Sequence, residues 1–137
     1  MRFHTSLPVI DVAETVAFYR ALFEAEPVKT RADYAKFLPP NAGLNISFHE
    51  LPDAARALSG LHVGLEVAGE AELDRAFERL TAAGLSPRMQ GEVTCCYARQ
   101  HKFWLTDPSG YRWEVYYVAE DTDEKTDPAA PCCPQSP

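Results

Sequence analysis

An internal repeat restricts the possible folds of this chain more than any other feature of the sequence. Residues 4–7 (His-Thr-Ser-Leu) recur as residues 62–65 (His-Val-Gly-Leu), 58 positions later, and an amphipathic helical stretch follows each segment. Further along, residues 43–48 match residues 110–115 at a separation of 67 positions. Each copy predicts a strand, a helix and three more strands. We therefore expect an α+β fold of two βαβββ modules that pair across a cleft. The predicted modules span residues 1–52 and 58–118.

Local signals support this interpretation of each copy. Asp11 followed by Glu14 has the spacing of a capping box, so a first helix is expected to begin there and to stop before Pro27. A second helix is expected to end at Gly84, where a left-handed cap is favourable. The segment 107–110 (Asp-Pro-Ser-Gly) predicts a turn before the last strand.

Charge and hydropathy exclude several classes of function. The net charge of −7 and the pI near 5.0 do not provide the basic face that a nucleic-acid-binding protein needs. No stretch is apolar for long enough to span a membrane. The first residues also lack the apolar core and cleavage site of a signal peptide. We therefore expect a cytoplasmic protein whose thiols are kept reduced.

Strand alternation places polar residues of the two copies on equivalent faces. Successive side chains of a strand point to opposite faces. In the segments around residue 62 and residue 114, His62 and Glu114 alternate with apolar residues. The positions in the first copy that correspond to them are His4 and Ser47. The repeat and the alternation therefore predict that His4, Ser47, His62 and Glu114 face the cleft.

This set of residues predicts a metal site. Two imidazoles and one carboxylate that leave open positions are typical of non-haem Fe(II) oxygenases, so we interpret His4, His62 and Glu114 as ligands of Fe(II). Zinc, nickel, cobalt or manganese could occupy the same ligands. The alternative is that these are unrelated polar residues on solvated sheet faces. That alternative does not explain why residues capable of binding a metal occur at positions related by the repeat. His49 and His101 are interpreted as surface or supporting residues.

The cysteines form two adjacent pairs, Cys95-Cys96 and Cys132-Cys133. Neighbouring residues bridge poorly because a disulfide prefers a larger separation of the Cα atoms, so each pair is interpreted as two free thiols. Alternation along a strand would point two neighbouring thiols apart, and we therefore expect the first pair in a loop or irregular segment, preceded by the turn-prone Gly91. Arg99 and Lys102 are candidate cations for stabilising the thiolates.

These motifs resemble a known superfamily. The paired modules with two histidines and a glutamate are similar to the vicinal oxygen chelate superfamily, which includes glyoxalase I, extradiol dioxygenases and thiol-transferring resistance proteins. Within it, the segments 94–98 (Thr-Cys-Cys-Tyr-Ala), 102–108 (Lys-Phe-Trp-Leu-Thr-Asp-Pro) and 113–116 (Trp-Glu-Val-Tyr) resemble the organoarsenical carbon–arsenic lyases and the related cadmium-induced proteins. The likeness covers residues 1 to about 118.

The resemblance implies an Fe(II)-dependent, dioxygenase-type carbon–arsenic lyase that gives resistance to organoarsenicals. In those lyases, residues that match His4, His62 and Glu114 hold Fe(II). Thiols that match Cys95 and Cys96 bind the arsenic of a trivalent methyl- or aryl-arsenical, and dioxygen is the co-substrate in the release of arsenite. The softness of trivalent arsenic, which favours thiolate ligands, agrees with this assignment.

Other interpretations of the sequence stay open. A protein of this kind could bind cadmium or arsenite without turnover. A third interpretation is a glyoxalase-type metal-dependent lyase, although such an enzyme normally has a fourth protein ligand at the position of Ser47. The segment 119–137 is expected to be a flexible acidic and Pro-rich tail, in which Cys132 and Cys133 are candidates for an accessory arsenic site. The sequence does not decide whether the modules pair within one chain or across a homodimer.

Overall fold

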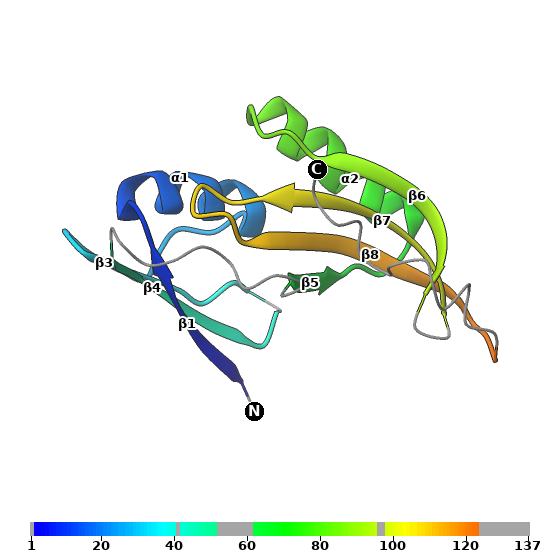
Figure 1. Ribbon diagram of the computed structural model, residues 1–137, viewed down its shortest axis with the longest axis horizontal. Helices are drawn as coiled ribbons and strands as arrows, with labels where there is room; N and C mark the ends of the chain where they lie inside the picture. Colours follow the sequence, from blue (N-terminus) through cyan, green and yellow to red (C-terminus); the bar gives the residue numbers. More distant parts are fainter. Residues whose placement is uncertain (1, 41, 52–61, 96–97, 124–137) are drawn as a thin grey trace. The chain divides into compact units, whose positions relative to one another are not determined.

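The computed structural model describes residues 2–40, 42–51, 62–95 and 98–123 (Figure 1). The described elements divide between two compact units. The first unit contains β1 (Phe3–Val9), α1 (Val12–Phe23), β2 (Lys29–Arg31), β3 (Tyr34–Phe37) and β4 (Leu44–Glu50), together with residues 106–111. The second unit contains β5 (His62–Glu66), α2 (Glu70–Ala82), β6 (Arg88–Cys95), β7 (Ala98–Thr106) and β8 (Arg112–Asp121).

Both units have the same sheet topology, as the repeat predicts. The strand order is β1-β4-β3-β2 in the first sheet and β5-β8-β7-β6 in the second. The first strand of each unit is parallel to the last one, and the hairpin strands are antiparallel. The α+β fold of two βαβββ modules is therefore confirmed. Strand β8 continues to Asp121, beyond the expected module end at residue 118.

The register of the strands reproduces the two separations of the repeat. In the first sheet Ser6 lies opposite Ser47, and in the second Gly64 lies opposite Glu114. Gly64 follows Ser6 by 58 positions and Glu114 follows Ser47 by 67 positions. These two pairs are thus equivalent positions of the two modules, and they can be compared directly.

The helix of the first unit begins and ends as its sequence suggests. The Asp11 side chain accepts a hydrogen bond of 2.8 Å from the backbone N–H of Glu14, which caps the first turn of α1. The helix ends at Phe23, because Glu24 adopts a left-handed conformation with φ of 50°, before Pro27 is reached. The buried ring of Tyr19 packs on Phe48 of β4 with a centroid distance of 4.2 Å. This contact fixes α1 on its sheet.

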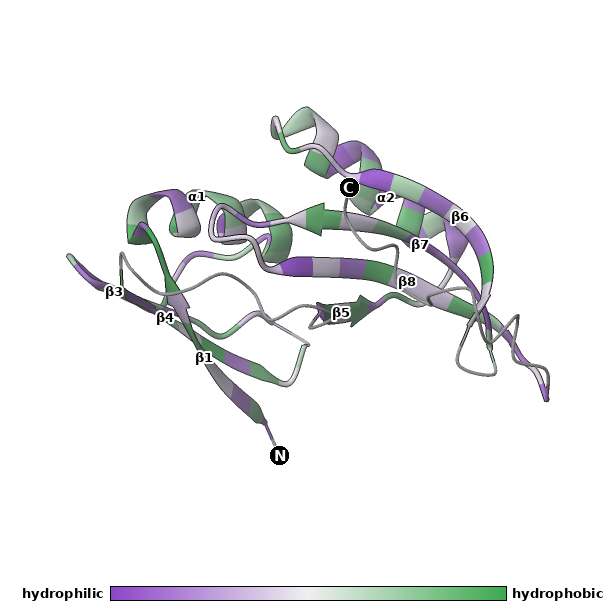
Figure 2. Ribbon diagram, viewed as in Figure 1, coloured by the Kyte–Doolittle hydropathy of each residue, from purple (hydrophilic) through white to green (hydrophobic). Residues whose placement is uncertain are grey.

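The helix of the second unit has more hydrophilic residues than α1, as Figure 2 shows. It buries Leu73 and Leu80, and Phe77 contacts Phe103 of β7 with a ring distance of 5.4 Å. Gly84 follows with φ of 82°, the left-handed cap expected there. No helix in the described part of the chain is both long and apolar enough to cross a membrane.

The turn that precedes β8 is fixed within the first unit by a buried carboxylate. Asp107 accepts hydrogen bonds from the backbone N–H groups of Ser109 and Tyr111 at 2.9 and 2.8 Å. Its second oxygen accepts a bond of 2.9 Å from the hydroxyl of Tyr19. Desolvation by burial raises the pKa of Asp107, although these hydrogen bonds oppose the shift. The turn therefore has a defined conformation where the chain enters β8.

Candidate functional site

The carboxylate of Glu114 is the centre of a polar cluster on one face of the second sheet. Its Oε1 lies 3.4 Å from Nε2 of His62, and its Oε2 accepts a hydrogen bond of 2.8 Å from Nζ of Lys102. The three residues come from β8, β5 and β7. Alternation along the strands turns them away from the apolar face on which α2 packs.

Lys102 is a functional candidate that the sequence reasoning missed in this role. Its side chain is only 3% exposed, and its ammonium lies 5.7 Å from the ring centroid of Trp104 and 5.8 Å from that of Tyr116. A buried ammonium needs a partner, which Glu114 supplies. The available signal was a lysine next to the apolar run Phe103–Leu105, a position where a charge is expected to be paired.

The separation of His62 and Glu114 suits two ligands of one ion. A charge-assisted hydrogen bond between an imidazolium and a carboxylate would be about 2.7–2.9 Å long. Two ligand atoms that each lie about 2.1 Å from one ion are roughly 3.0–3.5 Å apart in octahedral or tetrahedral geometry. The observed 3.4 Å falls in the second range. Nε2 of His62 and Oε1 of Glu114 are therefore spaced as two ligands of one divalent ion would be, while Lys102 bonds the other carboxylate oxygen.

Gly64 makes room for this carboxylate. A Cβ atom at Gly64 would lie 3.1 Å from Cγ and 3.2 Å from Oε1 of Glu114, and 3.1 Å from Cε1 of Tyr116. Such contacts are tighter than those that real Cβ atoms normally make. The glycine itself is exposed, while the position of the added Cβ is flanked by the Glu114 carboxylate and the Tyr116 ring.

Tyr116 lies beside Gly64 and the Glu114 carboxylate. Burial raises the pKa of its phenol, and the negative charges of Glu66 and Glu114 raise it further. The Tyr116 hydroxyl makes only a long contact of 3.5 Å with Oε2 of Glu66. A phenol with a raised pKa stays protonated and neutral beside the Glu114 carboxylate.

The equivalent face of the first unit carries hydroxyl groups and histidines. His4 Nδ1 lies 3.0 Å from the backbone oxygen of Asn45, which can only accept, so Nδ1 is the donor in this contact and Nε2 is not used by it. The hydroxyl of buried Ser47 donates to Ser6 at 3.0 Å, and Ser6 lies 3.3 Å from Nδ1 of His49. His49 thus contacts the serine pair through its Nδ1.

The structure brings only some of the predicted ligands together. His62 and Glu114 meet in the second unit, whereas His4 belongs to the first. Within the described ranges, no group of three or more His, Cys, Asp or Glu side chains is arranged to hold a metal ion. The complete triad of His4, His62 and Glu114 therefore stays a prediction.

The structure describes only the first cysteine of the pair that was expected in a loop or irregular segment. Cys95 is the last residue of β6 and lies opposite Ala98 of β7, because the antiparallel ladder continues to the end of the hairpin strands. Gly91 is not at a turn but at an irregularity within β6, with φ of 77°. Cys96, Cys132 and Cys133 lie outside the described residues.

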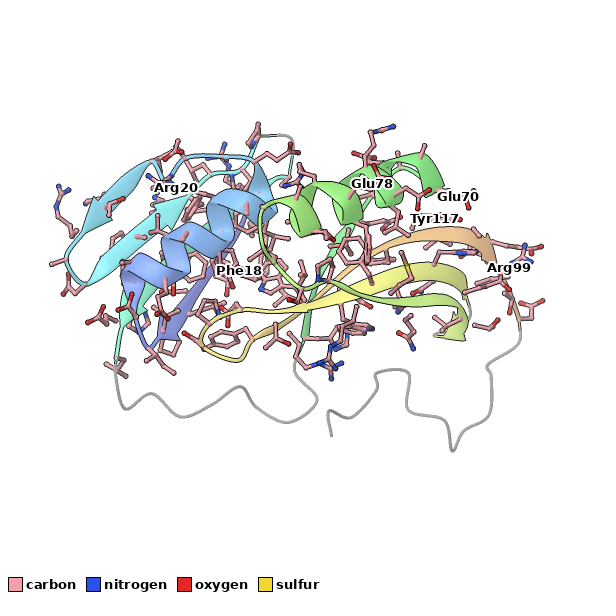
Figure 3. All side chains as sticks on the ribbon, turned by 90° about the horizontal axis from the view of Figure 1, so that it is seen from above. Phe18, Arg20, Glu70, Glu78, Arg99 and Tyr117 are labelled. Carbon is pink, nitrogen blue, oxygen red and sulfur yellow. The ribbon has the colours of Figure 1, made fainter. Side chains whose placement is uncertain are left out.

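The remaining candidates have other partners. Arg99 pairs with Glu120 at 3.0 Å, and Lys102 donates to Glu114 at 2.8 Å. Their predicted role toward the thiols stays a prediction. His101 stacks on Tyr117 with a centroid distance of 5.1 Å. Figure 3 shows Tyr117 on the side of the sheet that α2 covers, so His101 faces away from Glu114.

The repeated βαβββ architecture is that of the vicinal oxygen chelate fold. The chain belongs to the glyoxalase/bleomycin resistance protein/dioxygenase superfamily, whose family model matches residues 3–115. Among solved structures, a point mutant of the fosfomycin resistance protein FosX from Listeria monocytogenes has a TM-score of 0.62 and 26% identity. The alignment covers 82% of this chain and 85% of that one, whose structure is a complex with Mn(II) and a dihydroxypropylphosphonic acid.

Two relatives are more similar in sequence. A trivalent organoarsenical cleaving enzyme from Bacillus sp. (strain MD1) is 38% identical, over 98% of this chain and 83% of the relative. The cadmium-induced protein CadI from Mycobacterium tuberculosis (strain ATCC 25618 / H37Rv) is also 38% identical, over 89% of this chain and 79% of the relative. The expected resemblance to both groups is thus confirmed.

Proposed function

We propose that this chain is a cytoplasmic, Fe(II)-dependent carbon–arsenic lyase that converts trivalent organoarsenicals to arsenite with dioxygen as co-substrate. The observation that carries the proposal is the Glu114 carboxylate, with one oxygen 3.4 Å from His62 and the other bonded to Lys102. Its distance from His62 is compatible with two ligands of one ion, and the chain is 38% identical to a trivalent organoarsenical cleaving enzyme.

In this proposal His4, His62 and Glu114 hold the metal. His4 contributes Nε2, since its Nδ1 is occupied by the Asn45 carbonyl oxygen. When bound, Fe(II) supplies open coordination positions at which dioxygen and substrate can meet, as in other sites with two histidines and a carboxylate.

Residues around the ligands set their orientation. Lys102 holds Oε2 of Glu114, so that Oε1 points at His62, and its buried charge balances that of the carboxylate. Gly64 leaves the space that the carboxylate occupies. Supporting groups of this kind commonly change metal affinity by about 10–100-fold when they are removed.

The thiols are assigned to the substrate. Cys95 and Cys96 bind the soft arsenic atom, which orients its carbon–arsenic bond beside the metal and lowers the entropic cost of reaching the reactive geometry. The tail thiols Cys132 and Cys133 are proposed as an accessory arsenic-binding pair.

A second function is favoured by the likeness to CadI. In that case the chain would bind cadmium or arsenite stoichiometrically without turnover, and the cysteines would be the main ligands. The two functions differ in their product, because only a lyase releases arsenite from an organoarsenical.

The test is arsenite release after anaerobic loading with Fe(II), followed by addition of methylarsenite or phenylarsenite in air. We expect release that requires both Fe(II) and oxygen. Replacing Cys95 or Cys96 by serine should abolish release while the bound iron remains stoichiometric. Tight binding of the arsenical without any arsenite would contradict the lyase and support sequestration.

A further inference from the structure

The two oxygens of the Glu114 carboxylate have different partners. Oε2 accepts a hydrogen bond of 2.8 Å from Nζ of Lys102, whereas Oε1 lies 3.4 Å from Nε2 of His62. The side chain of Glu114 is 12% exposed and that of Lys102 is 3% exposed, so solvent screens the two charges only weakly. One oxygen is therefore bound to a buried positive charge, and the other lies beside the imidazole.

The ammonium of Lys102 is held by more than the carboxylate. It lies 5.7 Å from the ring centroid of Trp104 and 5.8 Å from that of Tyr116. Trp104 is held in turn, because its indole N–H donates to Gln90 at 2.7 Å. If the ammonium moved away from Oε2, it would lose both cation–π contacts together with a charge-assisted hydrogen bond. The positive charge beside Oε2 is therefore a lasting part of this face.

The ammonium beside Oε2 disfavours a second cation on the same oxygen. Like charges repel more strongly where solvent screening is weak. A divalent ion bound by both oxygens of Glu114 would share Oε2 with the ammonium, whereas an ion bound by Oε1 alone leaves the Lys102 hydrogen bond intact. Oε1 is also the oxygen whose distance from His62 suits two ligands of one ion. Both observations favour binding through a single oxygen.

We propose that Lys102 is a positioning residue that limits Glu114 to one metal-binding oxygen, Oε1, and thereby keeps one more coordination position open at the ion. This inference rests on the proposed function, in which His4 and His62 supply the other ligand atoms. An octahedral ion held in this way retains about three positions for exchangeable molecules, and a carboxylate bound through both oxygens would leave about two. The additional position is one at which the arsenical or dioxygen can bind.

The experiment measures the relaxation of water protons in solutions of the full-length protein saturated with Mn(II). Bound paramagnetic Mn(II) accelerates this relaxation in proportion to the number of exchangeable waters that it carries. The test variant is Lys102→Met, which removes the charge and largely retains the side-chain length. The matched control is Lys36→Met in β3 of the first unit.

Lys102→Met should lower the relaxation enhancement per bound Mn(II) by about one third, because Oε2 displaces one of roughly three waters. Lys36→Met should leave the enhancement unchanged. A side chain that only supports the fold would change the affinity for Mn(II) or the stability, and would not change the number of waters on each bound ion. Equilibrium dialysis of each variant supplies the amount of bound Mn(II).

Diffraction covers the cases in which Lys102→Met does not fold or the site does not take up Mn(II). In crystals of the wild-type protein loaded anaerobically with Fe(II), Oε1 of Glu114 should lie about 2.0–2.3 Å from the ion. Oε2 should lie beyond bonding distance and stay hydrogen-bonded to Lys102. If both oxygens are bonded to the ion, the positioning role is overturned.

The outcomes separate this inference from the proposed function. If the wild-type protein binds the metal ion and the enhancement per bound Mn(II) in Lys102→Met is unchanged or raised, the positioning role is overturned and the metal site stands. The same holds if only the affinity for Mn(II) falls. If the wild-type protein binds neither Fe(II) nor Mn(II), the proposed function fails, and the positioning role fails with it.

Discussion

The two modules place different chemistry on equivalent faces of the same architecture. In the first, Ser6 and Ser47 lie opposite each other and share a hydrogen bond of 3.0 Å. In the second, the equivalent residues are Gly64 and Glu114, and the glycine leaves the space that the longer carboxylate fills. Between the first module and the second, the edge-strand residue changes from serine to glycine, and its partner on the neighbouring strand changes from serine to a charged glutamate.

The largest difference in the effect of a substitution on Fe(II) binding is expected between the equivalent positions Glu114 and Ser47. Glu114→Ala should weaken Fe(II) binding by more than about a hundredfold, because a ligand is removed and Lys102 loses its partner. Ser47→Ala should leave the stoichiometry of bound iron unchanged, since its hydroxyl is engaged with Ser6. Anaerobic Fe(II) titration of both variants checks this. Stoichiometric iron in Glu114→Ala would count against the assignment.

The two modules also differ in the lysine beside that position. Lys102 contacts Glu114, whereas Lys36 of β3 lies opposite Ser47. Lys102→Met should destabilise the metal-free protein by about 3 kcal/mol, since it removes the ammonium that bonds a largely buried carboxylate. Added metal should restore part of the loss. Lys36→Met is the matched control, and denaturant unfolding with equal losses in both variants would argue against a special role for Lys102.

A smaller effect is expected at the edge strands. Gly64→Ala should weaken metal binding by about tenfold, because its Cβ forces Glu114 to shift. Ser6→Ala removes one hydroxyl contact in the first module and should leave metal affinity unchanged. Competitive titration against a metal indicator measures both. Unchanged affinity in Gly64→Ala would show that the carboxylate has room to adjust.

The fold was accessible from the sequence because the repeat and the strand alternation are local patterns. The separations of 58 and 67 positions already paired Ser6 with Gly64 and Ser47 with Glu114, and the strand register agrees with them. The ends of α1 and α2 followed from Asp11 and Gly84. The helix ends depend on residues that are close in sequence, and the repeat is visible from comparing short segments of the sequence, without knowledge of any contact between them.

The parts that could not be predicted depend on contacts between strands or on distant residues. Nothing in the sequence specifies that Lys102 points at Glu114, since the contact depends on how β7 lies beside β8. The bond from Tyr19 to Asp107 joins residues 88 positions apart. The placement of Cys95 in a strand depends on how far the ladder to Ala98 extends.

The smallest predicted effect concerns the turn before β8. The pKa of Asp107 is raised, so the folded state binds its proton more readily than the unfolded state, and its stabilising contribution is complete below pH 3.8. That contribution is lost as pH rises through the raised pKa. The free energy of unfolding of the wild type, minus that of Asp107→Asn, should therefore decrease as pH increases. Denaturant unfolding over a pH series would contradict this if the difference grew.

The central proposal is that His62 and Glu114 hold a metal ion together with His4. The most direct measurement is anomalous diffraction from crystals of the protein loaded with Fe(II) under anaerobic conditions. The account predicts one strong peak within about 2.0–2.3 Å of His4 Nε2, His62 Nε2 and Glu114 Oε1. A peak that lacks any of these three ligands, or metal bound by cysteine alone, would contradict it.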